Sequence, residues 1–146
     1  MRIFKQTVIH VVSPLILGGL LYISFRSLSL RMFTWFEIIG LENLILNIRN
    51  TVSTLKVMLP NWIYYSLPDG LWVYSLSSAL LILWDNQYEK GKYWLAIPLA
   101  FGVIIELAQS IKLFPGTFDI IDIFICSLAL LLSIKITKSN SLKNAH

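Results

Sequence analysis

Hydrophobic positions along the chain form long, nearly uninterrupted runs separated by short polar stretches. Four of these runs approach the roughly 20 residues that a helix needs to cross a bilayer. They cover about residues 7–25, 66–84, 93–111 and 118–135. The pattern predicts an all-α fold: an integral membrane bundle of four transmembrane helices in a single domain, residues 1–146, with a polar tail over 136–146.

The first run follows a basic start, Met1 to Lys5, which is also typical of a signal peptide. The apolar run is long for a signal peptide, and no small-residue cleavage site follows it. We therefore expect the first run to remain as a membrane span.

The segment between the first two runs, about residues 31–59, has a different pattern. Apolar residues recur there at steps of three and four, and charged and amide residues fill the opposite face, which predicts an amphipathic helix. We expect it to lie flat on the membrane surface or across the end of the bundle, as a connector or as a lid over a site. The apolar positions are Ile38, Leu41, Ile45, Ile48, Val52, Leu55 and Leu59.

Composition supports the membrane assignment. Of 146 residues, 56% are hydrophobic and only 14% are charged, whereas a soluble domain has a charged share of about 25%. An aromatic content of 13% also excludes a solvated, disordered chain. The net charge of +4 comes from basic residues at the edges of the apolar runs. That placement indicates membrane topology and contact with lipid headgroups, and we expect no nucleic-acid partner.

Basic residues also predict the orientation. Four spans put both termini on the same side of the membrane, and this side would carry seven Lys and Arg residues against five on the other. The five are spread over a longer stretch of chain, so the density also favours cytoplasmic termini. The seven are Arg2, Lys5, Lys90, Lys92, Lys135, Lys138 and Lys143.

Residues that usually hold cofactors are scarce. The chain has two histidines, His10 and His146, and one cysteine, Cys126, and it carries no zinc-type or nucleotide-binding motif. We expect neither a metal nor another cofactor. His10 is interpreted as a hydrogen-bonding residue between helices and Cys126 as a buried packing residue, while Gly18 and Gly19 would allow two helices to approach closely.

Acidic and amide residues inside the apolar runs form the candidate site. Asp69 begins the second run, Glu106 and Gln109 lie near the end of the third, and Asp119 and Asp122 begin the fourth. At about 1.5 Å of rise per residue, alternating spans bring all five within roughly two turns of the outer membrane face. Ionisable residues within spans are costly, so a polar pocket open to the outside is predicted.

Some of these acids also have purely structural explanations. Asp69 follows Pro68 at a helix start, where an acid complements the helix dipole, and Asp119 suits a helix N-cap. Glu106 lies near the C-terminal end of its run, where the dipole disfavours an anion. It must be protonated, paired with a cation or hydrogen-bonded across helices. The available cations are Lys112, Arg26, Arg49 and Lys56.

The spacing of these residues resembles the VanZ-like family of small bacterial multi-pass membrane proteins. That family has E-x-x-Q at the end of one span, as in Glu106 and Gln109, and D-x-x-D at the start of the next, as in Asp119 and Asp122. An early acid in the preceding span, like Asp69, is also common. The resemblance covers about residues 67–132. Two positions depart from the pattern: Thr117 stands where many members have Arg, and Cys126 where many have Asn.

The resemblance implies a multi-pass protein of the bacterial cytoplasmic membrane, and its namesake is linked to resistance against teicoplanin-type glycopeptide antibiotics. No established reaction is implied. The first hypothesis is therefore that the acidic pocket binds a cell-envelope component such as a lipid-linked glycan or its headgroup. Three alternatives are an enzyme acting on such a lipid, a cation or proton path, and an assembly subunit whose acids contact a membrane protein partner.

Overall fold

Long helices lying side by side dominate the fold, which comes from a computed structural model describing residues 2–84, 91–113 and 117–142. All the regular structure within these ranges is helical. Three helices are long and apolar enough to cross a membrane: Ile3–Phe25, Lys92–Ser110 and Ile120–Thr137. The chain is therefore a membrane protein by the length and composition of its helices.

The first of these helices is built from three joined pieces. Helix α1 (Arg2–Thr7) continues through a wide π-helical turn, η1 (Val8–Val12), into α2 (Ser13–Phe25). Pro14 follows the wide turn, and because proline lacks an N–H and its ring would clash with the carbonyl four residues earlier, a local widening relieves the strain. The helix begins at Arg2, earlier than the predicted start at residue 7.

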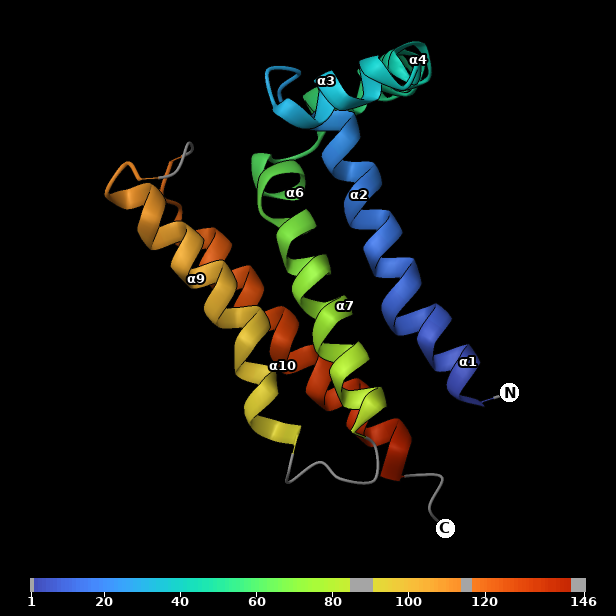
Figure 1. Ribbon diagram of the computed structural model, residues 1–146, viewed down its shortest axis with the longest axis vertical. Coiled ribbons are helices and arrows are strands. Elements are labelled where there is room, and N and C mark those ends of the chain that lie inside the picture. The colour runs from blue at the N-terminus through green and yellow to red at the C-terminus, as the bar shows by residue number, and fades with distance from the viewer. Residues whose placement is uncertain (1, 85–90, 114–116, 143–146) are drawn as a thin grey trace.

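Helix α7 (Leu67–Leu83) occupies the second predicted span and is apolar but only 17 residues long. It packs against α2, α9 (Ala96–Ser110) and α10 (Ile120–Leu142), so it is the central helix of the bundle (Figure 1). A short 3₁₀ turn, η3 (Lys92–Leu95), leads into α9. Helix α10 continues through residues 136–142 of the predicted polar tail, whereas positions 143–146 lie outside the described residues.

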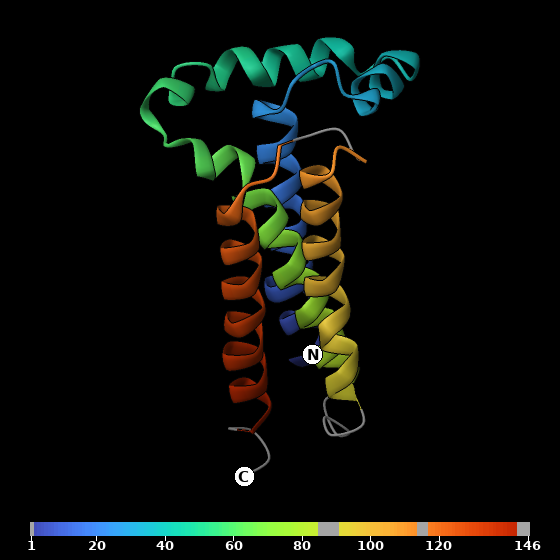
Figure 2. The ribbon, with the colours of Figure 1, turned by 90° about the vertical axis from the view of Figure 1, so that its left-hand side faces the viewer.

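The segment between α2 and α7 lies beyond the end of α2, at the end of the bundle opposite the one where the described chain begins and finishes (Figures 1 and 2). The prediction of a single helix over residues 31–59 is wrong. The segment divides into α3 (Arg31–Ile38), α4 (Glu42–Val52) and α5 (Leu55–Met58), and a fourth short helix, α6 (Asn61–Tyr65), leads into α7.

The first break in this segment has a clear local cause. Gly40 adopts φ of 76°, a conformation that is costly for residues with a side chain. The N–H of Leu41 donates to the carbonyl of Phe36 at 2.8 Å, and the N–H of Gly40 donates to Glu37 at 3.0 Å. This pair of bonds is the Schellman motif, which ends a helix by satisfying its last carbonyls.

Helix α4 is held against the end of α2 by two kinds of contact. Ile45 is only 5% exposed, and Arg49 Nη1 donates to the carbonyl of Ile23 at 2.7 Å. The Arg49 guanidinium also lies 5.5 Å from the centre of the Phe33 ring. Ile38, at the start of the predicted apolar face, is 76% exposed. The bundle therefore covers the middle of that face and leaves its beginning open.

Small residues set the spacing around α7. Gly18 of α2 lies where a Cβ atom would be 2.7 Å from Trp72 Nε1 and 3.2 Å from the carbonyl oxygen of Pro68, whereas a Cβ on Gly19 would have no neighbour within 4 Å. The expected close approach is therefore confirmed for Gly18 alone. Three buried residues, Val73, Cys126 and Ala129, form the apolar core between α7 and α10.

Two polar side chains inside the bundle form hydrogen bonds between helices. His10 Nδ1 lies 2.8 Å from the hydroxyl of Tyr74, which confirms the interpretation of His10 as a hydrogen-bonding residue between helices. The hydroxyl of Ser75 donates to the carbonyl of Val11 at 2.8 Å. Both bonds join the N-terminal helix to α7. A bilayer interior holds no water that could satisfy these polar groups instead.

We predict that Gly18→Ala lowers the stability of the bundle by about 1–3 kcal/mol, because the added methyl group would overlap the Trp72 ring and the Pro68 carbonyl. Gly19→Ala is the matched control and should change stability by no more than about 0.5 kcal/mol. Thermal unfolding of the purified variants in detergent measures both. Equal melting temperatures for the two variants would contradict the close packing of α2 on α7.

Candidate functional site

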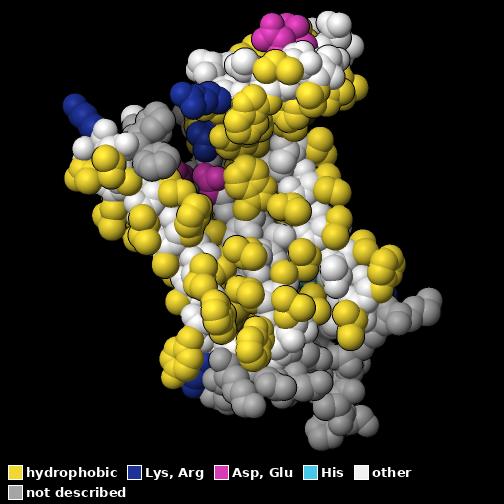
Figure 3. Space-filling model, in the orientation of Figure 1, with side chains coloured by type: hydrophobic (Ala, Val, Ile, Leu, Met, Phe, Trp, Pro, Cys, Tyr) yellow, Lys and Arg dark blue, Asp and Glu magenta, His cyan; other side chains and the backbone are white. Residues whose placement is uncertain are grey.

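Four of the five candidate site residues lie within the helices at one end of the bundle, the same end at which α3–α5 lie beyond α2. Asp69 is in the first turn of α7, Glu106 and Gln109 are in the last turns of α9, and Asp122 is in the first turn of α10. The fifth, Asp119, comes directly before α10. The alternating helix directions bring these positions together. Figure 3 shows acidic side chains recessed between the end of α9 and the overlying segment.

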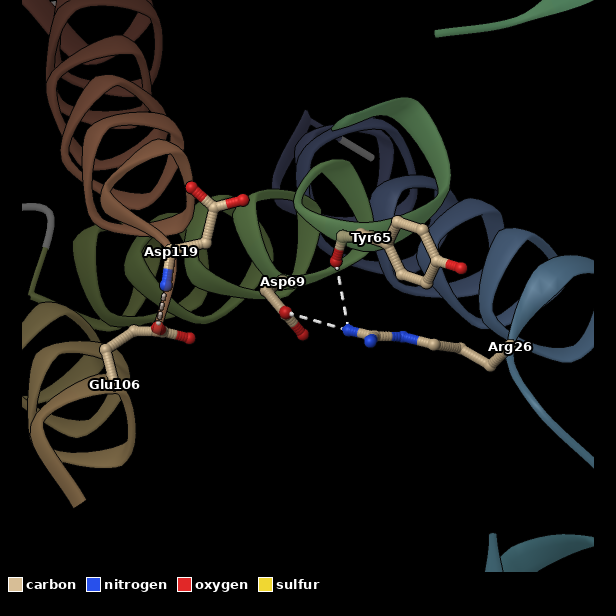
Figure 4. A network of polar contacts seen from close by, with 5 residues as sticks. All are labelled: Arg26, Tyr65, Asp69, Glu106 and Asp119. Carbon is tan, nitrogen blue, oxygen red and sulfur yellow. Dashed lines mark hydrogen bonds and ion pairs between the residues drawn. The ribbon is translucent and has the colours of Figure 1, made fainter. Parts of the chain in front are cut away.

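Asp69 forms an ion pair with Arg26, at the end of α2. Arg26 Nη2 lies 3.4 Å from Asp69 Oδ2 and also donates to the carbonyl of Tyr65 at 3.0 Å (Figure 4). The guanidinium is held between two aromatic rings, 5.2 Å from the centre of Tyr22 and 5.3 Å from that of Tyr65. Arg26 therefore joins α2, α6 and α7 at the edge of the acidic cluster.

Glu106 is the most buried of the five candidate residues, at 6% exposure. Its Oε2 accepts a hydrogen bond from the backbone N–H of Asp119 at 3.0 Å, which links α9 to the start of α10. No ion pair joins Glu106 to a cation in the described part of the chain. Of the three states predicted for this residue, the structure shows a hydrogen bond across helices.

The three acids of different helices also interact with one another. Glu106 is in side-chain contact with Asp122 and interacts electrostatically with Asp69, while Asp69 interacts with both Arg26 and Asp122. The group contains three carboxyl groups and one guanidinium, which pairs with Asp69 alone, so two negative charges are unbalanced when all the groups are ionised. We call Asp69, Glu106, Asp122 and Arg26 the charged cluster.

The other two predicted residues are peripheral. The side chain of Asp119 caps the start of α10, because its Oδ1 accepts from the backbone N–H of Ile121 at 2.9 Å. Helix capping is the structural explanation that the sequence also offered for Asp119. Gln109 is half-buried, and its side chain makes no hydrogen bond to any residue that the structure describes.

The sequence indicated Arg26 only as one of several cations available to Glu106, and it predicted no contact between Arg26 and Tyr65. The signal that could have found the Arg26–Asp69 pair is the position of Arg26 directly after an apolar run that ends at the same membrane face as Asp69. No sequence signal could have identified the Tyr65 carbonyl as an acceptor, because every residue has a backbone carbonyl. Within the described ranges, no three His, Cys, Asp or Glu side chains are arranged to hold a metal ion.

Comparison of the chain with models of known protein families, with curated proteins and with solved structures finds no match. The charged cluster must therefore be interpreted from its own chemistry.

We predict a favourable coupling of about 1 kcal/mol between Arg26 and Asp69, a modest value because both side chains are partly exposed. Arg26→Gln and Asp69→Asn should each lower the melting temperature in detergent, and the double variant should lose less than the sum of the two. Arg31→Gln, at an exposed site on α3, combined with Asp69→Asn is the control and should be additive. Additivity in both cycles would show that the ion pair contributes no stability.

Proposed function

We propose that this chain is a VanZ-like protein of the bacterial cytoplasmic membrane, in contact with membrane lipids, whose charged cluster faces outward and binds a cell-envelope component. In this proposal the chain crosses the membrane four times, both termini are cytoplasmic, and α3–α5 lie along the outer surface. A link to tolerance of glycopeptide antibiotics follows from the resemblance and would act through the same site.

The length of α7 is compatible with a fourth span. Its 17 residues extend about 26 Å, close to the roughly 30 Å of the hydrocarbon core. Helix α6 leads into it at the end where the charged cluster lies, and contacts α7 there. Helices α2, α9 and α10 pack against α7, as expected for the central span of a bundle.

The observation that carries the proposal is Glu106, a carboxyl group that is 6% exposed, near the C-terminal end of a helix, and beside two further acids with a single cation among them. Bundle packing does not require this arrangement, since an apolar residue would fill the same space without the cost of desolvating a charge. An ionisable residue within a span is costly, and it is therefore the first place to expect a functional site. A ligand that donates hydrogen bonds or carries positive charge would balance the cluster.

The arrangement in the membrane leads to a labelling prediction. In intact cells, a membrane-impermeant maleimide should modify an Asn47→Cys variant, which places a thiol on the exposed part of α4, and should not modify Ile3→Cys. Both variants should be carried in a Cys126→Ala background, which removes the native thiol. After the membrane is permeabilised, Ile3→Cys should react as well. Labelling of Ile3→Cys in intact cells would reverse the proposed orientation.

Glu106→Gln tests the function itself. Glutamine keeps the side-chain shape and the acceptor for the Asp119 N–H but removes the charge, so we expect stability within about 1 kcal/mol of the parent chain. Binding of envelope lipids should weaken at least about tenfold, because hydrogen bonds to charged groups contribute about 1.5–3 kcal/mol. Native mass spectrometry of the purified protein with total bacterial polar lipids and with a polyprenyl-diphosphate-linked disaccharide measures the bound fraction.

The matched control is Glu42→Gln, which removes an acid in the first turn of α4. It should bind both probes as the parent chain does. If neither probe binds to the parent chain, or if Glu106→Gln binds them as tightly, the proposed function is wrong.

A further inference from the structure

The segment formed by α3, α4 and α5 contacts the bundle at its middle. In α4, Ile45 is buried and Arg49 donates to the carbonyl of Ile23, in the last turn of α2. Figure 2 shows the segment as a bar that extends past the long helices on both sides, with α3 at one end and α5 at the other. Its two ends therefore project beyond the bundle.

The most exposed apolar side chains of the segment lie at these two ends. Five of them are each at least 63% exposed: Trp35, Ile38 and Ile39 at the α3 end, and Val57 and Met58 at the α5 end. We call these five residues the apolar ends. Contact of such side chains with water is unfavourable, and an exposed apolar surface of this kind marks contact with another protein or with a membrane.

The position of α2 indicates what covers the apolar ends. Helix α2 belongs to Ile3–Phe25, which is long and apolar enough to cross a membrane, and α4 rests on its last turn. Helix α2 also has an exposed apolar side, as expected where acyl chains surround a span. The residues of this side are Leu15, Ile16, Leu17 and Leu20. The apolar ends lie beside the end of this lipid-facing surface, so the same leaflet can reach them.

The polar and apolar sides of the segment are arranged as a lipid interface requires. Asn43, Asn47 and Asn50 are exposed and lie on the side of α4 opposite Ile45, at 3.6 residues per turn. Figure 3 shows acidic side chains on the upper side of the segment, and hydrophobic side chains gathered along its lower side next to those of α2. The polar side therefore points away from the bundle, and the apolar side points toward the level of the acyl chains.

We infer that the apolar ends insert into the leaflet beside α2, which makes α3–α5 an interfacial membrane anchor. The partner of the apolar ends is the acyl-chain boundary of the bilayer, and not a second protein. Helices of this kind lie about 5–10 Å into the boundary between headgroups and acyl chains. The anchor holds the end of α2, and with it Arg26, at a fixed depth, whichever ligand the charged cluster binds.

The anchor also decides between two roles that the sequence left open for this segment. A lid must move as a unit away from the site that it covers. The middle of the segment is fixed to α2 by Ile45 and Arg49, and both of its ends are held in lipid. The segment is therefore an anchored connector rather than a lid over the charged cluster.

Nitroxide accessibility tests the anchor on the full-length protein in phosphatidylcholine nanodiscs that hold one copy each. Ile38→Cys and Val57→Cys carry the label at the two apolar ends, and Asn47→Cys is the matched control on the polar side, all in a Cys126→Ala background. These three positions are exposed, so the labels should not disturb the fold. We expect the ratio of oxygen to nickel-chelate accessibility to be several-fold higher at positions 38 and 57 than at 47, because oxygen partitions into lipid. An equal ratio at either apolar end and at Asn47 would overturn the inference.

Nanodiscs that hold two copies distinguish lipid from a second copy of the chain. If lipid covers the apolar ends, the mobility and accessibility of both labels should be the same with one copy and with two. Labels that become immobile only with two copies would assign the apolar ends to an interface between copies and overturn the inference.

Tryptophan quenching gives a second measurement that keeps the native cysteine. The emission that is lost in Trp35→Phe reports on Trp35 alone, at an apolar end. Lipids brominated near the headgroup end of the acyl chain should quench this emission more strongly than lipids brominated near the methyl end, because the anchor lies at the boundary. Trp35 emission that neither lipid quenches would contradict insertion.

Discussion

The packing of α7 against its neighbours is the contact on which the rest of the structure depends. Membrane interiors offer no hydrophobic driving force between helices, so association relies on close packing and on hydrogen bonds between them. Gly18 lets α2 reach Trp72 and Pro68, while Val73, Cys126 and Ala129 join α7 to α10. Because α7 contacts every other long helix, its position determines where the acids of the other helices meet.

The same packing explains how several acids can share one end of the bundle. Two of the three carboxyl groups are partly compensated by a group from another part of the chain: Asp69 by Arg26 at the end of α2, and Glu106 by the backbone N–H that precedes α10. The compensation is incomplete, since Asp122 Oδ1 and Arg26 Nε stay without partners in the described chain. If the cluster served only to stabilise the fold, hydrogen-bond partners for these two atoms, or apolar residues in their place, would make the fold more stable. The persistence of these unpartnered atoms beside a recessed surface is why ligand binding, rather than packing, is the function we propose.

Particular residues show how far the site could be predicted. The intramembrane acids and their common membrane face follow from spacing and alternation of direction, and the structure places Asp69, Glu106 and Asp122 in mutual interaction. Asp119 had two explanations at the sequence level, and its contact with the N–H of Ile121 supports the helix cap. The pairing of Arg26 with Asp69, rather than with Glu106, could not be predicted. The sequence places several cations near the same predicted membrane face and does not show which acid each one meets.

The sequence by itself determined the helical class, the apolar runs and the approximate ends of the helices, because these depend on local hydrophobicity and on signals such as Pro68. The single surface helix was predicted from periodicity alone, and the break at Gly40 overrode it because a residue at positive φ ends a helix whatever pattern surrounds it. Only the tertiary structure decided which partner each buried polar atom finds. That choice depends on distances of a few ångströms between helices remote in sequence, which periodicity does not encode.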